Sequence, residues 1–410
     1  MFKGNCIVAQ SGGPTAVINA SACGIITEAF RRKTIEGVYA AKNGIIGVLD
    51  ENLFDLRREA PETFRLLKTT PGPGLGSCRY RLKPAEKDET EYRRIFEVFE
   101  AHDIRYFFYI GGNDSMDTAL KIHNYARKTG YPLAALGIPK TIDNDLPGTD
   151  HSPGYGSAAK YVAASVMEIK RDAESYNTNI VTIVEVMGRN TGWLAAAGAL
   201  AAPDLIYMPE TPFSFERFNE DVGKACRKKG KVLIVVSEGI KDGRGQFIFK
   251  TQAHRHDIFG HHQLGGVGFL LEDFVKEHIE PRVKTVQLGI LQRCAVHFAS
   301  GTDLAEAFLA GREAVRYAVD GNSGFMVSLE REKGRRYRCR TILTDLSEVA
   351  NKVKPLPRDW INPAGNHVTR ECLEYIRPLT EREVRLPMAG GLPRFARLKE
   401  IYLEKRCKHS

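Results

Sequence analysis

Short apolar segments and amphipathic segments alternate along most of this 410-residue chain. The apolar segments have the length and composition of buried strands, and they cover residues 6–9, 106–110, 133–138, 180–187, 232–236 and 283–288. The amphipathic segments between them have a helical period and cover residues 16–30, 117–128, 157–174 and 215–229. Apolar strands of this kind are typical of parallel sheets that are covered on both faces. The pattern therefore predicts an α/β protein with doubly wound, mainly parallel sheets.

Composition limits the classes of protein that remain. No segment is apolar over the length needed to cross a bilayer, and the first residues run into a strand-like segment without the build of a signal peptide. The eight cysteines form no Cys-x-x-Cys pair, so neither a zinc site nor a disulfide framework is indicated. We expect a cytoplasmic protein that does not bind a membrane.

The net charge of +9 is compatible with a nucleic-acid partner or with small phosphorylated substrates. The basic residues are dispersed among acidic ones rather than gathered in a stripe. We therefore expect no nucleic-acid partner, because a cationic pocket for a phosphorylated small molecule accounts for the same excess of positive charge.

Glycines follow three of the predicted strands, in the loops where a doubly wound sheet collects its ligands. These residues are Gly12 and Gly13, Gly111 and Gly112, and Gly188. Glycine lets the backbone approach a ligand closely, and the helix that follows offers free N–H groups to an anion. Glycine turns end many strands without any ligand, but the recurrence favours one shared crevice. The P-loop pattern is absent, as is a Gly-x-Gly-x-x-Gly after the first strand.

Asp143 and Asp145 flank Asn144 in the loop after the predicted strand 133–138. In an extended segment, two residues spaced in this way project to the same side. A carboxylate pair suits a general base beside a group that holds a metal ion or orients the substrate, as in phosphoryl transfer. An ordinary turn stabilised by Asp and Asn side chains explains the same residues. The loop alone leaves both interpretations open.

Five motifs occur in one order along the chain. They are IGGNDS (110–115), PKTIDNDLPGTD (139–150), VEVMGRNTGWLA (184–195), SEG (237–239) and LQR (291–293). In their order and approximate spacing these motifs resemble the phosphofructokinase family, from the first glycine loop to about residue 330.

The resemblance implies two phosphofructokinase-like α/β domains and an added C-terminal segment of helix and loop. We expect a donor-binding domain over residues 1–156, completed by about 292–345. We expect a sugar-phosphate domain over residues 157–291, completed by about 346–410.

The resemblance also implies roles on the sugar side of the site. Asp143 matches the base that takes the proton from the 1-hydroxyl of fructose 6-phosphate, and Asp145 matches its partner carboxylate near the metal and the sugar. Arg189 matches a residue that holds the sugar phosphate and offsets charge on the transferred group. An arginine suits phosphate because it donates two charge-assisted hydrogen bonds in one plane. The other implied sugar-side residues are Thr141, Met187, Gly188, Glu238 at the sugar hydroxyls, Lys284, and Arg293 at the 6-phosphate.

On the donor side, two positions separate the branches of the family. Asp114 and Lys140 stand where the ATP-using branch typically has glycine, and both are charged, as in the branch that uses pyrophosphate. A carboxylate at Asp114 would fill the space of the α-phosphate and repel its charge, while Lys140 would act as a point charge on a small donor. The resemblance therefore implies reversible, pyrophosphate-dependent phosphorylation of fructose 6-phosphate. The other implied donor-side residues are Gly12, Gly13, Arg79, Gly112 and Thr141.

Other interpretations of these residues stay open. An aspartate such as Asp114 is favoured at any helix N-terminus, and Lys140 taken alone is typical of a surface lysine. An ATP-dependent phosphofructokinase and a non-catalytic sugar-phosphate sensor are the alternative functions. Sedoheptulose 7-phosphate is an alternative acceptor, because it shares the reacting end.

Departures from the family pattern concern the metal and the subunit contacts. Asn113 stands where many members have a metal-binding aspartate, so we expect Mg²⁺ to be bound by Asp114, Asp145 and the pyrophosphate itself. Ile180 and Lys284 occupy positions that often carry arginines reaching the sugar phosphate of a neighbouring subunit. These positions still suggest active sites shared between subunits, and hence a homodimer or a homotetramer.

Two other groups of residues attract attention without a clear pattern. Four histidines lie close together, but their spacing matches no standard zinc site, and we expect a loop near the sugar or the subunit interface. Tyr375 and Arg377 either cover the sugar phosphate or take part in ordinary helix packing, and we favour packing. The four histidines are His254, His256, His261 and His262.

Overall fold

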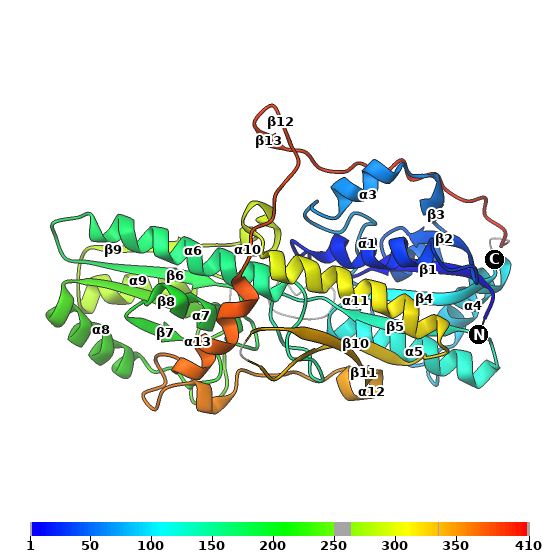
Figure 1. Cartoon of the computed structure of the whole chain (residues 1–410). Helices are drawn as coiled ribbons and strands as arrows, with labels where there is room; N and C mark the ends of the chain where they lie inside the picture. Colours follow the sequence, from blue (N-terminus) through cyan, green and yellow to red (C-terminus); the bar gives the residue numbers. More distant parts are fainter. Residues whose placement is uncertain (1, 250–263, 335, 408–410) are drawn as a thin grey trace.

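The computed structural model describes residues 2–249, 264–334 and 336–407. Two main sheets lie side by side along the length of the molecule, each with helices on both faces (Figure 1). The predicted α/β fold with mainly parallel sheets is confirmed. Within the described part of the chain, no helix is both long and apolar enough to cross a membrane.

The larger sheet has seven strands in the order β11-β10-β5-β4-β1-β2-β3. Its five inner strands are parallel, while the edge strands β3 and β11 run antiparallel to their neighbours. Successive residues of β4 enter opposite hydrophobic cores, Phe107 and Tyr109 on one face and Tyr106 and Phe108 on the other. The strands are β1 (Gly4–Gln10), β2 (Ile35–Ala41), β3 (Leu53–Asp55), β4 (Ile104–Gly111), β5 (Ala134–Pro139), β10 (Phe325–Arg331) and β11 (Cys339–Asp345).

Helices cover both faces of this sheet. On one face α1 (Ile18–Ala29) packs against α11 (Gly301–Val319), and α3 (Pro61–Leu67) lies beside α1. Gly311 permits the close approach of α1 and α11, because an added Cβ would lie 2.0 Å from the carbonyl oxygen of Ser21. The helices on the other face are α2 (Ile45–Leu49), α4 (Thr90–Ala101), α5 (Asn113–Thr129) and α12 (Leu346–Val349).

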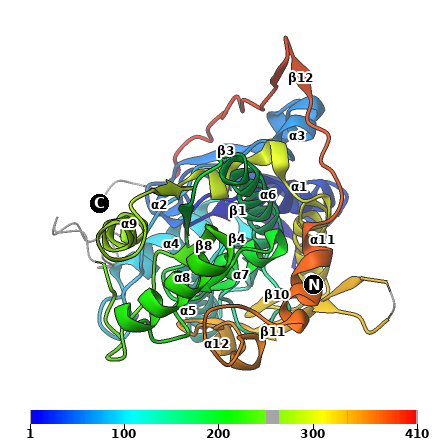
Figure 2. The same ribbon diagram turned by 90° about the vertical axis from the view of Figure 1, so that its left-hand side faces the viewer.

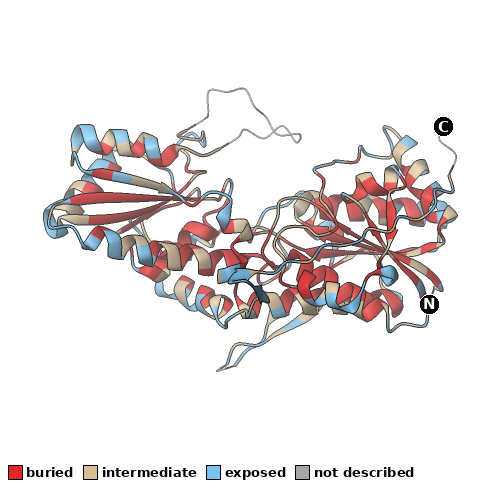
Figure 3. Cartoon of the chain, turned by 90° about the horizontal axis from the view of Figure 1, so that it is seen from above, coloured by how far each residue is buried: buried red, intermediate tan, exposed pale blue. Residues whose placement is uncertain are grey.

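The smaller sheet has four parallel strands in the order β7-β8-β6-β9. Val184 and Val186 of β6 face α6 (Tyr155–Glu174) and α7 (Trp193–Ala197), whereas Val181 and Ile183 face α8 (Phe215–Lys229) and α9 (Val267–His278). The central strands of both sheets are buried along most of their length (Figure 3). The strands are β6 (Ile180–Val186), β7 (Leu205–Tyr207), β8 (Lys231–Ser237) and β9 (Val283–Gln287).

The C-terminal segment contacts both sheets. Its helix α13 (Arg370–Ile376) packs beside α7 on the smaller sheet. The chain then forms a hairpin of β12 (Met388–Ala389) and β13 (Leu392–Pro393), which stands away from the body (Figure 1, Figure 2). It returns along the larger sheet, where the N–H of Leu403 donates to the carbonyl of Leu53 at 2.8 Å. The two-domain division stays a proposal. We expected residues 346–410 to complete the sugar-phosphate domain, but on this contact we assign residues 398–407 to the donor-binding domain instead.

All six predicted strands and all four predicted helices are present. Helix α5 begins at Asn113, earlier than the predicted start at Asp117. Strands β2, β3, β7, β10 and β11 were not predicted from the sequence. All five lie at the edges of the sheets or next to them, where apolar runs are shorter and less continuous.

Candidate active site

One cleft lies where the two sheets meet. It is formed at the carboxyl ends of β1, β4 and β5 from the larger sheet and of β6 and β8 from the smaller one, with the short helix α10 (Leu291–Cys294) beside them. Its volume of about 490 Å³ is in the range of small-molecule sites. The predicted site residues that line it are Gly12, Gly13, Arg79, Gly112, Asp114, Lys140, Thr141, Asp143, Asp145, Met187, Arg189, Glu238 and Arg293.

Two predicted residues, Gly188 and Lys284, do not line this cleft. Gly188 has φ of 141° and accepts a hydrogen bond from Ser237 at 2.6 Å, and an added Cβ would lie 2.6 Å from the carbonyl oxygen of Thr191. It therefore shapes the turn that carries Met187 into the cleft. The side chain of Lys284 is half exposed, and its Nζ donates to the hydroxyl of Tyr176 at 2.8 Å. The role of Lys284 at a neighbouring subunit stays a prediction.

Lys140 directly follows β5 and is buried, with 2% of its surface exposed. Its Nζ donates to the carbonyl oxygen of Gly13 at 2.6 Å, so it rests on the first glycine loop. Burial lowers the pKa of Lys140 to about 8, although the carboxylate of Asp143 acts in the opposite direction. The surface-lysine interpretation is therefore wrong, and the lysine instead presents a cation at the centre of the cleft.

Two hydrogen bonds hold the backbone of Asp143 in place. The N–H of Asp143 donates to Oγ1 of Thr141 at 3.0 Å, and its carbonyl accepts from Oγ1 of Thr191 at 3.1 Å. Burial and the nearby carboxylates of Asp145 and Glu238 raise the pKa of Asp143 to about 7. A carboxyl group with a pKa near neutrality is suited to take up a proton and return it during a reaction.

Asp114 lies in the first turn of α5 and lines the cleft opposite the glycine loop. Within the described ranges, its carboxylate has no hydrogen-bond or ion-pair partner in the protein. Both interpretations of this residue are thus compatible with its position. A carboxylate at the start of a helix is stabilised by the helix dipole, and this one also projects its charge into the cleft.

Asn113 supports a loop instead of presenting a carboxylate to a metal. Its amide donates to the carbonyl oxygens of Val349 and Lys352 and accepts a hydrogen bond from the N–H of Asn351. An aspartate could not donate to two carbonyl oxygens, which explains why an amide stands here. The loop places Asn351 and Val353 in the lining of the cleft, beside Arg81.

Lys354, in the C-terminal segment, supports the loop that carries Asp145 and was not predicted from the sequence. Its N–H donates to the carbonyl of Asp145 at 2.7 Å, and its Nζ donates to the carbonyls of Thr149 and Asp150 at 3.0 and 2.8 Å. Burial lowers the pKa of Lys354 to about 8. No local motif marks this lysine, because its partners lie about two hundred residues away in the chain.

A buried ion cluster lies next to residues 143–150, which we call the acidic loop. The imidazole of His151 lies 2.8 Å from the carboxylates of both Asp150 and Glu306. Arg331 donates to Asp150 at 3.2 Å, and the hydroxyl of Tyr337 donates to Glu306 at 2.6 Å. Burial opposes protonation of His151, but the two carboxylates prevail and raise its pKa to about 9. At neutral pH the cluster therefore contains an imidazolium that links the loop to α11.

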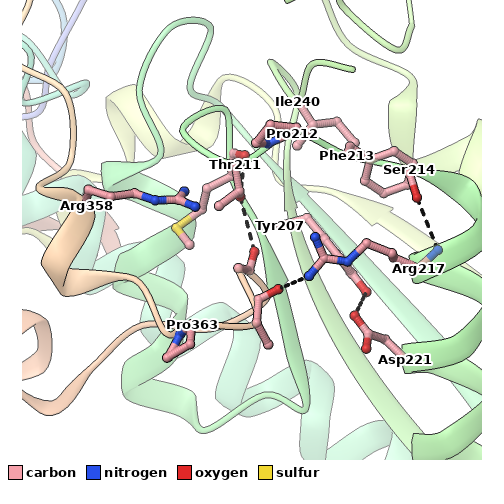
Figure 4. A pocket seen from close by; sticks show the side chains of 13 residues that line it. Tyr207, Thr211, Pro212, Phe213, Ser214, Arg217, Asp221, Ile240, Arg358 and Pro363 are labelled. Carbon is pink, nitrogen blue, oxygen red and sulfur yellow. Dashed lines mark hydrogen bonds between the residues drawn. The ribbon is translucent and has the colours of Figure 1, made fainter. Parts of the chain in front are cut away.

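A second hollow lies beside β7 and α8 (Figure 4) and shares no lining residue with this cleft. Its volume of about 50 Å³ holds only a few water molecules. The two arginines at its wall are already bound, Arg217 to the carbonyl of Ala364 at 2.7 Å and Arg358 to that of Glu210 at 3.1 Å. This hollow is not suited to a substrate.

The remaining predicted residues have different outcomes. Tyr375 is buried and packs against Trp193, so the packing interpretation is confirmed for it. Arg377 is exposed and does not line the cleft. His254, His256, His261 and His262 lie outside the described residues.

This chain is similar to known phosphofructokinases in both sequence and structure. The family model described as phosphofructokinase matches residues 5–318. The pyrophosphate–fructose 6-phosphate 1-phosphotransferase of Methylococcus capsulatus is 44% identical over 419 residues, covering 100% of this chain and 99% of that protein. The enzyme of the same name from Halomonas elongata is 44% identical, with 99% of each chain covered. The crystal structure of a pyrophosphate-dependent phosphofructokinase from Marinobacter aquaeolei has a TM-score of 0.89 and 41% identity, again over 99% of each chain.

The ion cluster predicts a dependence of stability on pH. His151 has a pKa of about 9 in the folded chain and about 6.5 when unfolded. Its contribution is therefore fully present below about pH 6.5 and is lost as the pH rises through 9; a shift of this size corresponds to about 3 kcal/mol. Denaturant unfolding at several pH values should show that His151→Gln is less stable than wild type at pH 6, with the difference shrinking towards pH 10. A difference that does not change with pH would contradict a protonated His151.

The loop held by Asn113 predicts an effect at the donor end of the cleft. Asn113→Asp replaces two donated hydrogen bonds by repulsion between oxygens, so we expect the loop to shift and pyrophosphate to bind about tenfold more weakly, as for a loss of about 1.4 kcal/mol. Isothermal titration calorimetry measures the affinity for pyrophosphate in wild type and in Asn113→Asp. Asn322→Asp is the control, since its amide donates to the carbonyl of Tyr317 at 3.0 Å outside the cleft. Equal affinity in Asn113→Asp and wild type would refute the role of the loop.

Proposed function

We propose a function from the premise that this chain belongs to the phosphofructokinase family. It is a pyrophosphate-dependent 6-phosphofructokinase, which transfers a phosphoryl group from pyrophosphate to the 1-oxygen of fructose 6-phosphate and releases fructose 1,6-bisphosphate and phosphate. The observation that carries this proposal is that Lys140 and Asp114 line the same cleft as the glycine loop and Asp143.

The acceptor is activated by Asp143. Its carboxylate takes the proton of the sugar 1-hydroxyl as the hydroxyl oxygen attacks the phosphorus of the donor in line with the leaving phosphate. A pKa of about 7 suits this role in both directions, because the protonated group can return the proton when the bisphosphate reacts with phosphate. This reversibility is in keeping with a donor that releases less free energy than ATP.

The donor is held by the first glycine loop and by cations. The loop at Gly12 and Gly13 lets the backbone approach the phosphate oxygens closely, and Arg79 and Lys140 neutralise their charge. Lys140 is already fixed by its hydrogen bond to Gly13, so little order has to be gained when the donor binds. Asp114 disfavours ATP, because its negative charge lies where a longer donor would place a further phosphate.

The sugar phosphate is held from the smaller sheet. We assign Glu238 to the sugar hydroxyls, Arg293 to the 6-phosphate, and Arg189 to the sugar phosphate and the transferred group, with Met187 and Thr141 beside them. The guanidinium of Arg293 lies close to the donor loop, since an added Cβ on Gly13 would lie 3.3 Å from its Nη1. The cleft therefore brings a cation from the smaller sheet next to the first glycine loop of the larger one.

Mg²⁺ is the cofactor that we propose, as is general for phosphotransferases of this family. The described residues contain no cluster of three His, Cys, Asp or Glu side chains that could hold a metal by themselves. This fits Mg²⁺, which is usually bound by one or two carboxylates together with substrate phosphates. Asp145 and Asp114 would hold the ion with pyrophosphate, and the ion would supply charge neutralisation on the phosphate oxygens.

Several finer points stay predictions. These are assembly as a homodimer or homotetramer with shared active sites, and a location in the cytoplasm; the use of sedoheptulose 7-phosphate as a second acceptor also stays open. A non-catalytic sensor is disfavoured, because Asp143, Asp145 and Arg189, the residues that the transfer reaction needs, all line the one cleft.

The proposed base can be tested by substitution. Asp143→Ser should lower kcat with pyrophosphate by about 10²–10⁴-fold, because general-base catalysis contributes this much, with little change in the KM for fructose 6-phosphate. Initial rates at saturating pyrophosphate and Mg²⁺ measure both quantities. Asp221→Ser is the control, since its carboxylate accepts hydrogen bonds from Tyr207 and Asn366 outside the cleft. Near-native turnover of Asp143→Ser would remove Asp143 from the role of base.

A further inference from the structure

The residue between the two acidic side chains of the site has an uncommon backbone conformation. Asn144 is fully buried and has φ of 52°, in the left-handed region. Few residues other than glycine adopt this conformation, and asparagine is one of those that tolerate it. Because Asp143 and Asp145 flank it directly, the conformation of Asn144 sets the directions in which both carboxylates leave the loop.

Both ends of the Asn144 amide are bound. Its Oδ1 accepts a hydrogen bond from the N–H of Ser152 at 2.9 Å, and its Nδ2 donates to the hydroxyl of Tyr375 at 3.0 Å. That hydroxyl donates its own proton to the carbonyl oxygen of Asp150 at 2.7 Å. The Tyr375 hydroxyl therefore joins the two arms of the acidic loop, at Asn144 and at Asp150.

Tyr375 is itself held firmly in place. Its ring packs against Trp193 and Trp360, with centroids 5.4 and 4.9 Å away. The guanidinium of Arg331 lies 4.5 Å above the ring centroid and donates to the Tyr375 carbonyl at 3.1 Å. Tyr375 does not line the cleft, so it can act on the substrates only through the loop.

We propose that Tyr375 is a positioning residue, which holds Asn144 in its left-handed turn and so directs Asp143 and Asp145 into the cleft. The proposal rests on the proposed function, since it concerns the same reaction. Positioned groups are sensitive to small shifts, because a displacement of about 1 Å can lower a rate by about 10²-fold. The C-terminal segment, which lies beyond the residues matched by the family model, then takes part in catalysis through α13.

The variant Tyr375→Phe tests this role. It keeps the ring and its packing but removes the hydroxyl, which leaves the buried amide of Asn144 without an acceptor. We expect kcat with pyrophosphate and fructose 6-phosphate to fall by about 10–100-fold, while the KM values of both substrates change little. The separation of kcat from KM distinguishes positioning of the reacting groups from a general loss of structure.

Tyr155→Phe is the matched control. Tyr155 is fully buried in the same hydrophobic cluster, and its hydroxyl donates to the carbonyl of Trp193 at 3.1 Å. This variant loses a similar buried hydrogen bond without touching the acidic loop. We expect a similar decrease in Tm in both variants, but a kcat close to that of wild type only in Tyr155→Phe.

A double-mutant cycle with Asn144→Ala gives an independent measure. Both substitutions break the same hydrogen bond, so the kcat of the double variant should be close to that of the lower single variant. Fully additive losses would overturn the proposal, as would a Tyr375→Phe variant whose kcat equals that of wild type or of Tyr155→Phe. A wild-type enzyme without pyrophosphate-dependent activity would overturn the proposed function, and the positioning role with it.

Discussion

Opposite charges buried in one cleft are the constraint on which the rest of the structure depends. Burial alone would favour the neutral forms of Lys140 and Asp143, and the attraction between these two side chains opposes that effect in both. Lys140 comes from the larger sheet, like the acidic loop itself, whereas Arg189 comes from the smaller one, so the loop has both compensating charges only when the two sheets meet. The arrangement concentrates charge where phosphoryl transfer needs it and leaves the base with a pKa near neutrality.

The central strands β1, β4, β5, β6 and β8 and the loops that follow them could be predicted from the amino-acid sequence. Continuous apolar runs mark such strands, and the carboxyl ends of parallel strands converge, so the pattern already places Gly12, Lys140 and Asp143 together. The roles that residues have through distant contacts could not be found in this way. Asn113, Lys354 and Tyr375 depend on partners that are many residues away, and no local pattern predicts such pairs. Edge strands such as β11 were missed because a half-exposed strand contains fewer apolar residues.

The C-terminal segment has a larger role than its place outside the family motifs suggests. The loop 349–354 is fixed to α5 by Asn113 and to the acidic loop by Lys354, and α13 supports the same acidic loop through Tyr375. Three separate contacts thus connect this segment to α5 and to the loop that carries Asp143 and Asp145. They also fix the loop that brings Asn351 and Val353 into the lining of the cleft.

The central claim is that charged side chains at Asp114 and Lys140 select pyrophosphate. The most direct test is the ratio of kcat/KM for pyrophosphate to kcat/KM for ATP, measured with fructose 6-phosphate and Mg²⁺ in wild type and in Asp114→Gly. The account predicts a wild type that strongly prefers pyrophosphate, and a ratio at least about tenfold lower in Asp114→Gly, as expected if more than about 1.4 kcal/mol of repulsion is removed. A wild type that prefers ATP, or a ratio unchanged by the substitution, would contradict it.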